Sequence, residues 1–295
     1  MEAARQSARK YGLSPQRAVV LYFVVTFAIS WSAALALAAP RLLRGEAIPK
    51  FTGLMMFPLM LLGPLVAGVG LTWLLDGVAG VRSLVARMLR WRTGAGWYLA
   101  LLVPPVFMLA ALGGMRLLGG AVYGPNLFVV GAGFGVVAGW VEEPGWTGFA
   151  LHRLLPTGDG LRKAMAVGAI WSLWHLPVVD FLGAATPHGR WLLPYWMAFA
   201  AVMVAVRVLI AWVYAHTRSV LLAQMVHASS TGALVVFSPA HVTAAEECLW
   251  YVAYAALMWL AIALVWNRLR FASLGDGGCG VQLADGLIKA DPLRE

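Results

Sequence analysis

Long apolar runs follow one another along this chain, and they limit its fold more than any other feature. About eight of them reach the ~20 residues that a helix needs to cross a bilayer. They cover approximately residues 18–39, 52–75, 95–120, 127–154, 161–182, 191–216, 219–237 and 248–268. Because 61% of the 295 residues are hydrophobic and 12% are charged, a soluble fold could not bury this apolar surface. The sequence therefore predicts an all-α polytopic membrane protein. It excludes a disordered chain, a secreted disulfide scaffold and an ordinary cytosolic enzyme.

The positive charges predict how the helices are oriented. The net charge is +9. With a cytoplasmic N-terminus, roughly three quarters of the Lys and Arg residues fall in cytoplasmic segments, as the positive-inside rule requires. We therefore expect both termini in the cytoplasm, and we expect no nucleic-acid partner. We interpret the first run as an uncleaved helix, because it is long for a signal peptide. The high Ala, Gly, Val and Arg content favours a bacterial plasma membrane.

A single transmembrane domain is expected over residues 1–274, followed by a mobile cytoplasmic tail over 275–295. No repeat at a fixed period is visible, which disfavours an inverted-repeat transporter. Cys248 and Cys279 lack metal-ligand spacing and fall on opposite sides of a predicted span, so we expect no disulfide between them. The sequence specifies no oligomeric state.

Two adjacent carboxylates, Glu142 and Glu143, fall inside the fourth apolar run. Burying one carboxylate in hydrocarbon costs a few kcal/mol, so such residues are functional candidates by default. The alternative is a structural polar contact with Arg207 across the bundle. Being adjacent, the two carboxylates point about 100° apart and cannot do the same job. Pro144 follows directly, and it predicts a kinked helix beside them.

Two histidines, His175 and His227, also lie well inside predicted spans. Counted from the cytoplasmic ends at ~1.5 Å per residue, Glu142 and His175 differ in depth by about 3 Å. His227 and Arg207 lie at compatible depths, so we expect these side chains to converge. Spacing of four residues places further side chains on shared helix faces. These pairs are Glu143 with Thr147, Trp171 with His175, and His227 with Thr231.

This set of side chains favours hydrolysis. A carboxylate in a low-dielectric pocket can act as a general base, and imidazole can bind a metal or donate to an oxyanion. Together they suit the activation of water for attack on a carbonyl. The chain contains neither a G-x-S-x-G nucleophile motif nor an H-E-x-x-H zinc motif, so the residues alone identify no particular metal.

Three short segments carry a resemblance to a known family. Residues 142–147 read EEPGWT, where the family has E-E-x-x-x-R. Residues 171–177 read WSLWHLP, which matches an aromatic-x-x-x-His motif followed by Leu-Pro. Residues 227–231 read HASST, where the family has H-x-x-x-N. In these segments, and more loosely over about 60–235, the sequence resembles the CAAX protease and bacteriocin-processing (CPBP or Abi) family, which includes the type II CAAX prenyl endopeptidases.

The resemblance implies an eight-helix intramembrane metallo-endopeptidase whose site opens towards the cytoplasm. By it, Glu142 activates water, Glu143 orients the site, and His175 and His227 bind a divalent metal such as zinc or hold the water and oxyanion. If both histidines and Glu142 bind zinc, Glu143 is the expected base. The implied partners are the lipid bilayer and a membrane-associated peptide, either prenylated and of CaaX type or bacteriocin-like.

The sequence departs from the motifs at two positions, where Thr147 replaces Arg and Thr231 replaces Asn. Neither threonine offers the charge or forked donors of the family residue. Arg207 is a hypothetical substitute for the missing charge. The departures leave a second interpretation open, in which a catalytically weakened relative acts as a binding, scaffolding or immunity protein. A third is a proton-coupled transporter that uses the acidic pair and Arg207 as a relay.

Overall fold

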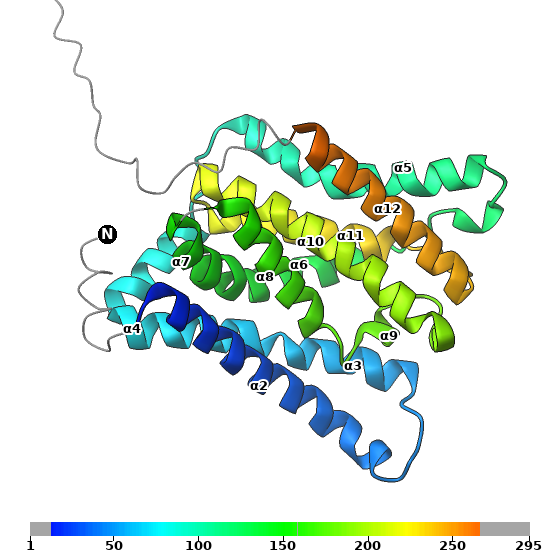
Figure 1. Cartoon of the computed structure of the whole chain (residues 1–295), viewed down its shortest axis with the longest axis horizontal. Helices are drawn as coiled ribbons and strands as arrows, with labels where there is room; N and C mark the ends of the chain where they lie inside the picture. The colour runs from blue at the N-terminus through cyan, green and yellow to red at the C-terminus, as the bar shows by residue number, and fades with distance from the viewer. Residues whose placement is uncertain (1–12, 158, 266–295) are drawn as a thin grey trace, which may run out of the picture.

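The computed structural model describes residues 13–157 and 159–265, and within these ranges the chain forms helices and no strand. The long helices run along one common direction and pack side by side as a bundle (Figure 1). Its main helices are α2 (Pro15–Leu42), α3 (Lys50–Met60), α4 (Leu62–Met88), α5 (Val103–Leu117), α6 (Gly131–Gly145), α8 (Gly160–Trp174), α10 (Leu192–Thr217), α11 (Val220–Phe237) and α12 (Ala244–Val265). This confirms the predicted all-α class.

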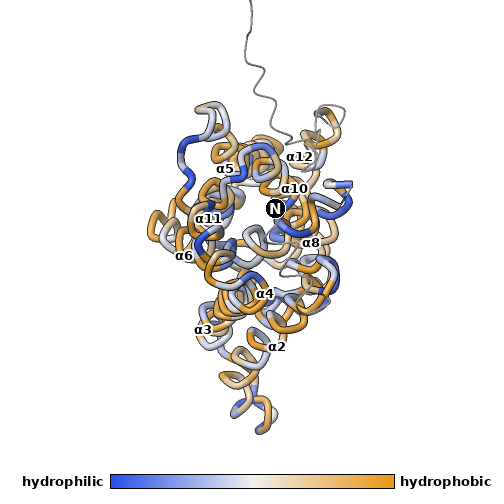
Figure 2. Tube along the Cα trace, turned by 90° about the vertical axis from the view of Figure 1, so that its left-hand side faces the viewer, coloured by the Kyte–Doolittle hydropathy of each residue, from blue (hydrophilic) through white to orange (hydrophobic). Residues whose placement is uncertain are grey.

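Six helical stretches of the described chain are long and apolar enough to cross a membrane. They are Pro15–Leu42, Lys50–Met88, Ala95–Leu117, Gly189–Thr217, Val220–Phe237 and Ala244–Leu264. Seen from the end of the bundle nearest α7 (His152–Leu154), hydrophobic positions dominate the helices (Figure 2). The predicted fourth and fifth spans contain α6 and α8, which have 15 residues each. A count of eight spans and cytoplasmic termini therefore stay predictions, and the tail over 275–295 with Cys279 lies outside the described residues.

Short helical segments connect the long ones. Those not yet named are η1 (Ala95–Leu102), η2 (Ala121–Tyr123), η3 (Trp146–Leu151), η4 (Leu155–Thr157), α9 (Val179–Leu182) and η5 (Gly189–Trp191). The loops after α4, before α8 and between α10 and α11 lie at the same end of the bundle (Figure 1). These are the loops for which the charge pattern predicts the cytoplasmic side.

Glycines on α6 allow α4 and α11 to pack closely against it. A Cβ atom at Gly139 would collide with the Gln224 carbonyl on α11, and one at Gly145 would collide with the Pro64 carbonyl on α4. Glycine at these positions lets the backbones approach closely, as in other membrane helix pairs. The close packing of α6 on α11 carries the acidic pair of one helix to the histidine of the other.

Two prolines mark irregular backbone. Helix α6 continues through Pro144 to Gly145, and a π-helical turn, η3, follows directly. Pro144 offers no N–H to the Trp140 carbonyl, which instead accepts a hydrogen bond from Gln224 Nε2 at 3.2 Å. The span predicted over 161–182 is also not continuous, because α8 ends at Trp174. Pro177 disfavours helical geometry at Leu176, so the chain leaves the helix at His175 and begins the four-residue helix α9 at Val179.

Candidate active site at the end of α6

Glu142 and Glu143 are both fully buried near the C-terminal end of α6. Their side chains have different partners, as their offset around the helix predicts. Glu142 contacts two tryptophan indoles, whereas Glu143 contacts a cation, a histidine and a hydroxyl. The two carboxylates therefore have separate environments within one cluster.

Both oxygens of Glu143 accept hydrogen bonds. Arg207 Nη1 lies 2.9 Å from Oε1 and 3.0 Å from Oε2. His227 Nδ1 lies 2.7 Å from Oε1, and the Thr147 hydroxyl donates to Oε2. Charge-assisted bonds of this kind are about twice as strong as neutral ones. Glu143 is thus a fully paired carboxylate that holds its neighbours in place.

Arg207 reaches this site from α10 and is itself fully buried. The hypothesis that it replaces the motif arginine requires direct contact with a carboxylate, and that contact is present. Its guanidinium carbon also lies 4.2 Å from the centre of the Trp171 ring, within the range of a cation–π interaction. Thr147 adds a neutral hydrogen bond, so both side chains donate to Glu143.

Glu142 is held on one side only. Its Oε2 accepts hydrogen bonds from Trp146 Nε1 at 3.0 Å and Trp171 Nε1 at 2.8 Å. Its Oε1 is buried and has no hydrogen-bond partner among the described residues. His227 Nε2 lies 3.8 Å from this oxygen, because the bond from Nδ1 to Glu143 fixes the imidazole ring. An unpaired buried carboxylate oxygen is costly, and here it faces the free nitrogen of a histidine.

His175 lies at the end of α8, beside the cluster rather than hydrogen-bonded to it. Its Nδ1 bonds the Trp171 carbonyl at 2.8 Å, and its ring packs among aromatic rings that include Phe57 and Phe199. The Trp171 ring contacts both histidines, with centroid distances of 5.5 Å to His175 and 5.0 Å to His227. Sequence depth placed His175 near the carboxylates, and the structure separates it from them by this indole.

Thr231 is half-buried one turn beyond His227, and its hydroxyl makes no hydrogen bond to the cluster in the described chain. The residues predicted to hold a metal, His175 and His227, each have Nδ1 engaged, which leaves Nε2 as the free nitrogen, as in metal-ligating histidines. However, the described residues contain no group of three or more His, Cys, Asp or Glu side chains placed to hold a metal ion. The arrangement therefore does not fit a metal site, and no step below depends on one.

The role of Trp146 was not predicted from the sequence. Its donation to Glu142 is a contact between residues four apart. The same spacing correctly paired Glu143 with Thr147. The same spacing counted from Glu142 would have predicted its contact with Trp146.

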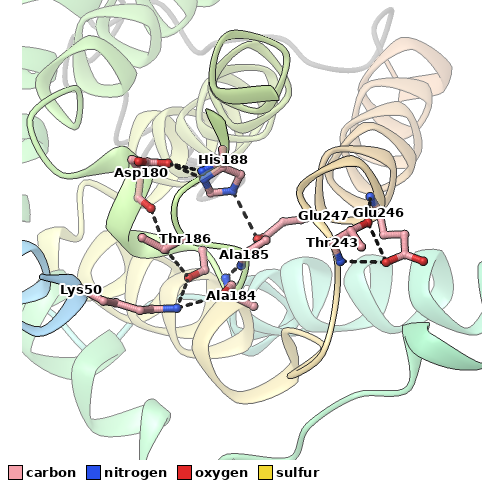
Figure 3. A network of polar contacts seen from close by, with 10 residues as sticks. Lys50, Asp180, Ala184, Ala185, Thr186, His188, Thr243, Glu246 and Glu247 are labelled. Carbon is pink, nitrogen blue, oxygen red and sulfur yellow. Dashed lines mark hydrogen bonds and ion pairs between the residues drawn. The ribbon is translucent and has the colours of Figure 1, made fainter. Parts of the chain in front are cut away.

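A second polar group, built around the buried His188 and Glu247 and hereafter called the outer cluster, was also missed. It joins Lys50, Asp180, His188 and Glu247 at the opposite end of the bundle from the loop before α8 (Figures 1 and 3). The His188 ring lies between Asp180 Oδ1 at 2.6 Å and Glu247 Oε2 at 3.3 Å. Glu247 also accepts backbone N–H groups from Ala184 and Ala185. Burial of His188 opposes its protonation, but the hydrogen bonds with Glu247 and Asp180 outweigh this and raise its pKa.

Residues 124–233 match the family model described as type II CAAX prenyl endopeptidase Rce1-like. The match covers less than half of the chain, and it supports the resemblance to the CAAX protease family. The matched segment contains every residue of the cluster around Glu142 and Glu143, including Arg207. The outer cluster lies only partly within the match, because Asp180 and His188 are inside it and Lys50 and Glu247 are outside. No curated protein matches the chain.

Proposed function

We propose that this chain is an intramembrane endopeptidase in which Glu142 activates water to hydrolyse a peptide bond of a membrane-associated substrate. CAAX-type endopeptidase chemistry in general follows from the family. The single observation that carries the proposed mechanism is the unpaired Oε1 of Glu142, buried and facing His227 Nε2 at 3.8 Å. A general base must lie within hydrogen-bond reach of the proton that it removes, and this oxygen is free to do so.

In the proposed mechanism, a water molecule between Glu142 and His227 donates one hydrogen to Oε1 and its other hydrogen to Nε2. His227 can accept because its Nδ1–H is donated to Glu143. Glu142 takes the first proton as the water oxygen attacks the scissile carbonyl. It then delivers that proton to the departing amine. The overall reaction adds one water molecule across the peptide bond, and Glu142 ends each cycle as a carboxylate.

Glu143 and Arg207 act on this step indirectly. Both Glu143 oxygens already accept hydrogen bonds, and a guanidinium offers no acceptor, so neither side chain is free to take a proton from a substrate. Glu143 instead fixes the His227 tautomer and ring orientation, as a carboxylate does in other histidine-carboxylate pairs. A proton relay through Arg207, as a transporter would need, receives no support from this arrangement.

The test is cleavage by the detergent-purified protein, read by mass spectrometry. The panel contains farnesylated CaaX peptides and unprenylated hydrophobic peptides, with Glu142→Gln as the paired variant. We expect one class to be cleaved by the wild type and not by the variant. Equal cleavage by both would overturn the role of Glu142. If no peptide is cleaved, and the Glu142→Gln strain keeps the wild-type phenotype while a deletion strain does not, the binding or scaffolding interpretation replaces this one.

Chelation tests the metal prediction separately. Because the described residues present no metal-ligand group, we expect cleavage to survive dialysis against a chelator. Loss of activity that added zinc restores would instead assign His175 and His227 as ligands.

A further inference from the structure

The two indole N–H groups on Glu142 are unusual within this chain. Of the tryptophan side chains in the described residues, only Trp146 and Trp171 donate to a side-chain acceptor, and both donate to the same oxygen. The other indole hydrogen bonds go to backbone carbonyls. The two donors come from separate elements, η3 and α8, and both indoles are buried.

This arrangement makes the two oxygens of Glu142 unequal. Oε2 has two donors and Oε1 has none among the described residues. An indole N–H can only donate, so it can satisfy a carboxylate oxygen but cannot take up a proton. Rotating the carboxylate to exchange its oxygens would break both bonds in a buried, low-dielectric site, where unmade bonds to charged groups are costly.

We propose that Trp146 and Trp171 are positioning residues that fix the Glu142 carboxylate so that Oε1, and not Oε2, removes the proton from water. This rests on the proposed function above. Positioning matters because a misplacement of about 1 Å at a reacting group can lower a rate by about 100-fold. The family motif asks only for an aromatic ring at residue 171, and tryptophan supplies a hydrogen-bond donor in addition.

Packing holds both indoles rigidly enough for this role. The Trp146 ring meets Tyr22 edge-on at 5.6 Å and Trp174 at 6.0 Å. The Trp171 ring packs between the Arg207 guanidinium at 4.2 Å and the His227 ring at 5.0 Å. Trp171 therefore connects the closed ion pair of Glu143 to the open carboxylate of Glu142.

The sharpest test removes the N–H and keeps the ring. Replacing Trp171 with 3-benzothienylalanine, which carries sulfur in place of the N–H, preserves size and shape. We expect kcat to fall by about 10-fold or more, with KM and the melting temperature unchanged, because a hydrogen bond to a charged group is lost. The same change at both Trp146 and Trp171 should lower kcat further. A ring-fluorinated tryptophan at residue 171, which retains the N–H, should restore activity.

Trp250 provides a matched control. It is fully buried on α12, and its Nε1 has no hydrogen-bond partner among the described residues. The same replacement at Trp250 should leave kcat unchanged. A loss of similar size there would show that the effect is structural and would overturn the proposal.

A spectroscopic readout detects the bonds without turnover. In protein labelled with ¹⁵N at the indoles, Glu142→Met should move the Trp146 and Trp171 N–H proton resonances upfield and leave that of Trp250 in place. Unmoved resonances would overturn the proposal. A wild-type kcat in the benzothienyl variants would also overturn it. If Glu142→Gln inactivates the enzyme in that case, the proposed function would still stand. Failure of the wild type to cleave any peptide would overturn the proposed function and this inference with it.

Discussion

Two buried clusters of this molecule each place a histidine between two carboxylates. In the site at the end of α6, His227 lies between Glu142 and Glu143. In the outer cluster, His188 lies between Asp180 and Glu247. The histidine and the glutamates of both are almost entirely excluded from solvent. By residue type the two clusters are similar.

They differ in how the carboxylate oxygens are satisfied. Glu247 accepts backbone N–H groups at 2.9 Å and 2.7 Å from two consecutive residues, one on each oxygen, so the loop after α9 closes around it (Figure 3). Glu142 has both of its donors on one oxygen and none on the other. A carboxylate with both oxygens paired stabilises the fold, whereas an open acceptor is available to a reactant. The number of hydrogen-bond donors on each carboxylate oxygen therefore distinguishes the two clusters better than their residue types do.

The largest stability effect is expected from breaking the closed part of the site. Arg207→Met leaves Glu143 buried without its cation, which costs about 3–5 kcal/mol in comparable buried pairs. We expect a large drop in melting temperature in detergent and loss of cleavage. Adding Glu143→Gln should recover part of the stability and none of the activity. An Arg207→Met protein as stable as the wild type would contradict the importance of this ion pair.

Breaking the outer cluster should separate stability from activity. Glu247→Gln replaces one carboxylate oxygen by an amide that cannot accept the Ala184 or Ala185 N–H, at a cost of about 1–3 kcal/mol. We expect a lower melting temperature and a kcat near that of the wild type below the transition. Loss of cleavage in a folded Glu247→Gln protein would contradict the assignment of this cluster to structure.

The outer cluster also predicts a pH dependence of stability. Its carboxylates raise the pKa of His188 despite burial, so the folded state binds this proton more tightly than the unfolded state. The contribution is complete below the ordinary histidine pKa of about 6.5 and is lost as the pH rises through the raised value. Between pH 6 and 9 the wild-type melting temperature should fall more than that of His188→Gln. Parallel curves for the two proteins would rule out this linkage.

The smallest effect is expected at Lys50. Its ammonium donates to the carbonyls of Gly183 and Ala184, both at 2.9 Å, and no carboxylate depends on it for charge. Lys50→Met should therefore lower stability by about 1 kcal/mol, in the range of single hydrogen bonds. Lys50→Met is the matched control for Arg207→Met. An equal loss of stability in the two variants would contradict the distinction between a cation that pairs with a buried carboxylate and one that contacts only backbone carbonyls.

Much of the site could be predicted because it depends on helical periodicity. Apolar runs predicted the helices, and spacing of four residues predicted the contact between Glu143 and Thr147. Depth along the spans correctly brought Arg207 and His227 to the acidic pair. These features follow from the regular rise and turn of a helix, so a sequence is enough to estimate them.

The remaining features depend on irregular backbone or on partners far apart in the chain. His175 was expected within a span, but the helix ends at Trp174, and its side chain lies beside the cluster. Thr231 shares a face with His227, yet its hydroxyl does not reach the carboxylates. The outer cluster joins Ala184 to Glu247, which are 63 residues apart, through a loop without periodicity. Propensity and spacing carry no signal for such contacts.

One paired measurement tests the central claim, that the open carboxylate performs chemistry and the closed one supports the fold. Glu142→Gln and Glu247→Gln proteins are compared for cleavage of the same peptide in ¹⁸O-labelled water, with melting temperatures taken alongside. We predict that Glu142→Gln keeps a wild-type melting temperature and loses about 100-fold or more in rate, without ¹⁸O entering the peptide. Glu247→Gln should melt earlier and still incorporate one ¹⁸O atom per cleavage. Wild-type cleavage by Glu142→Gln would contradict the account.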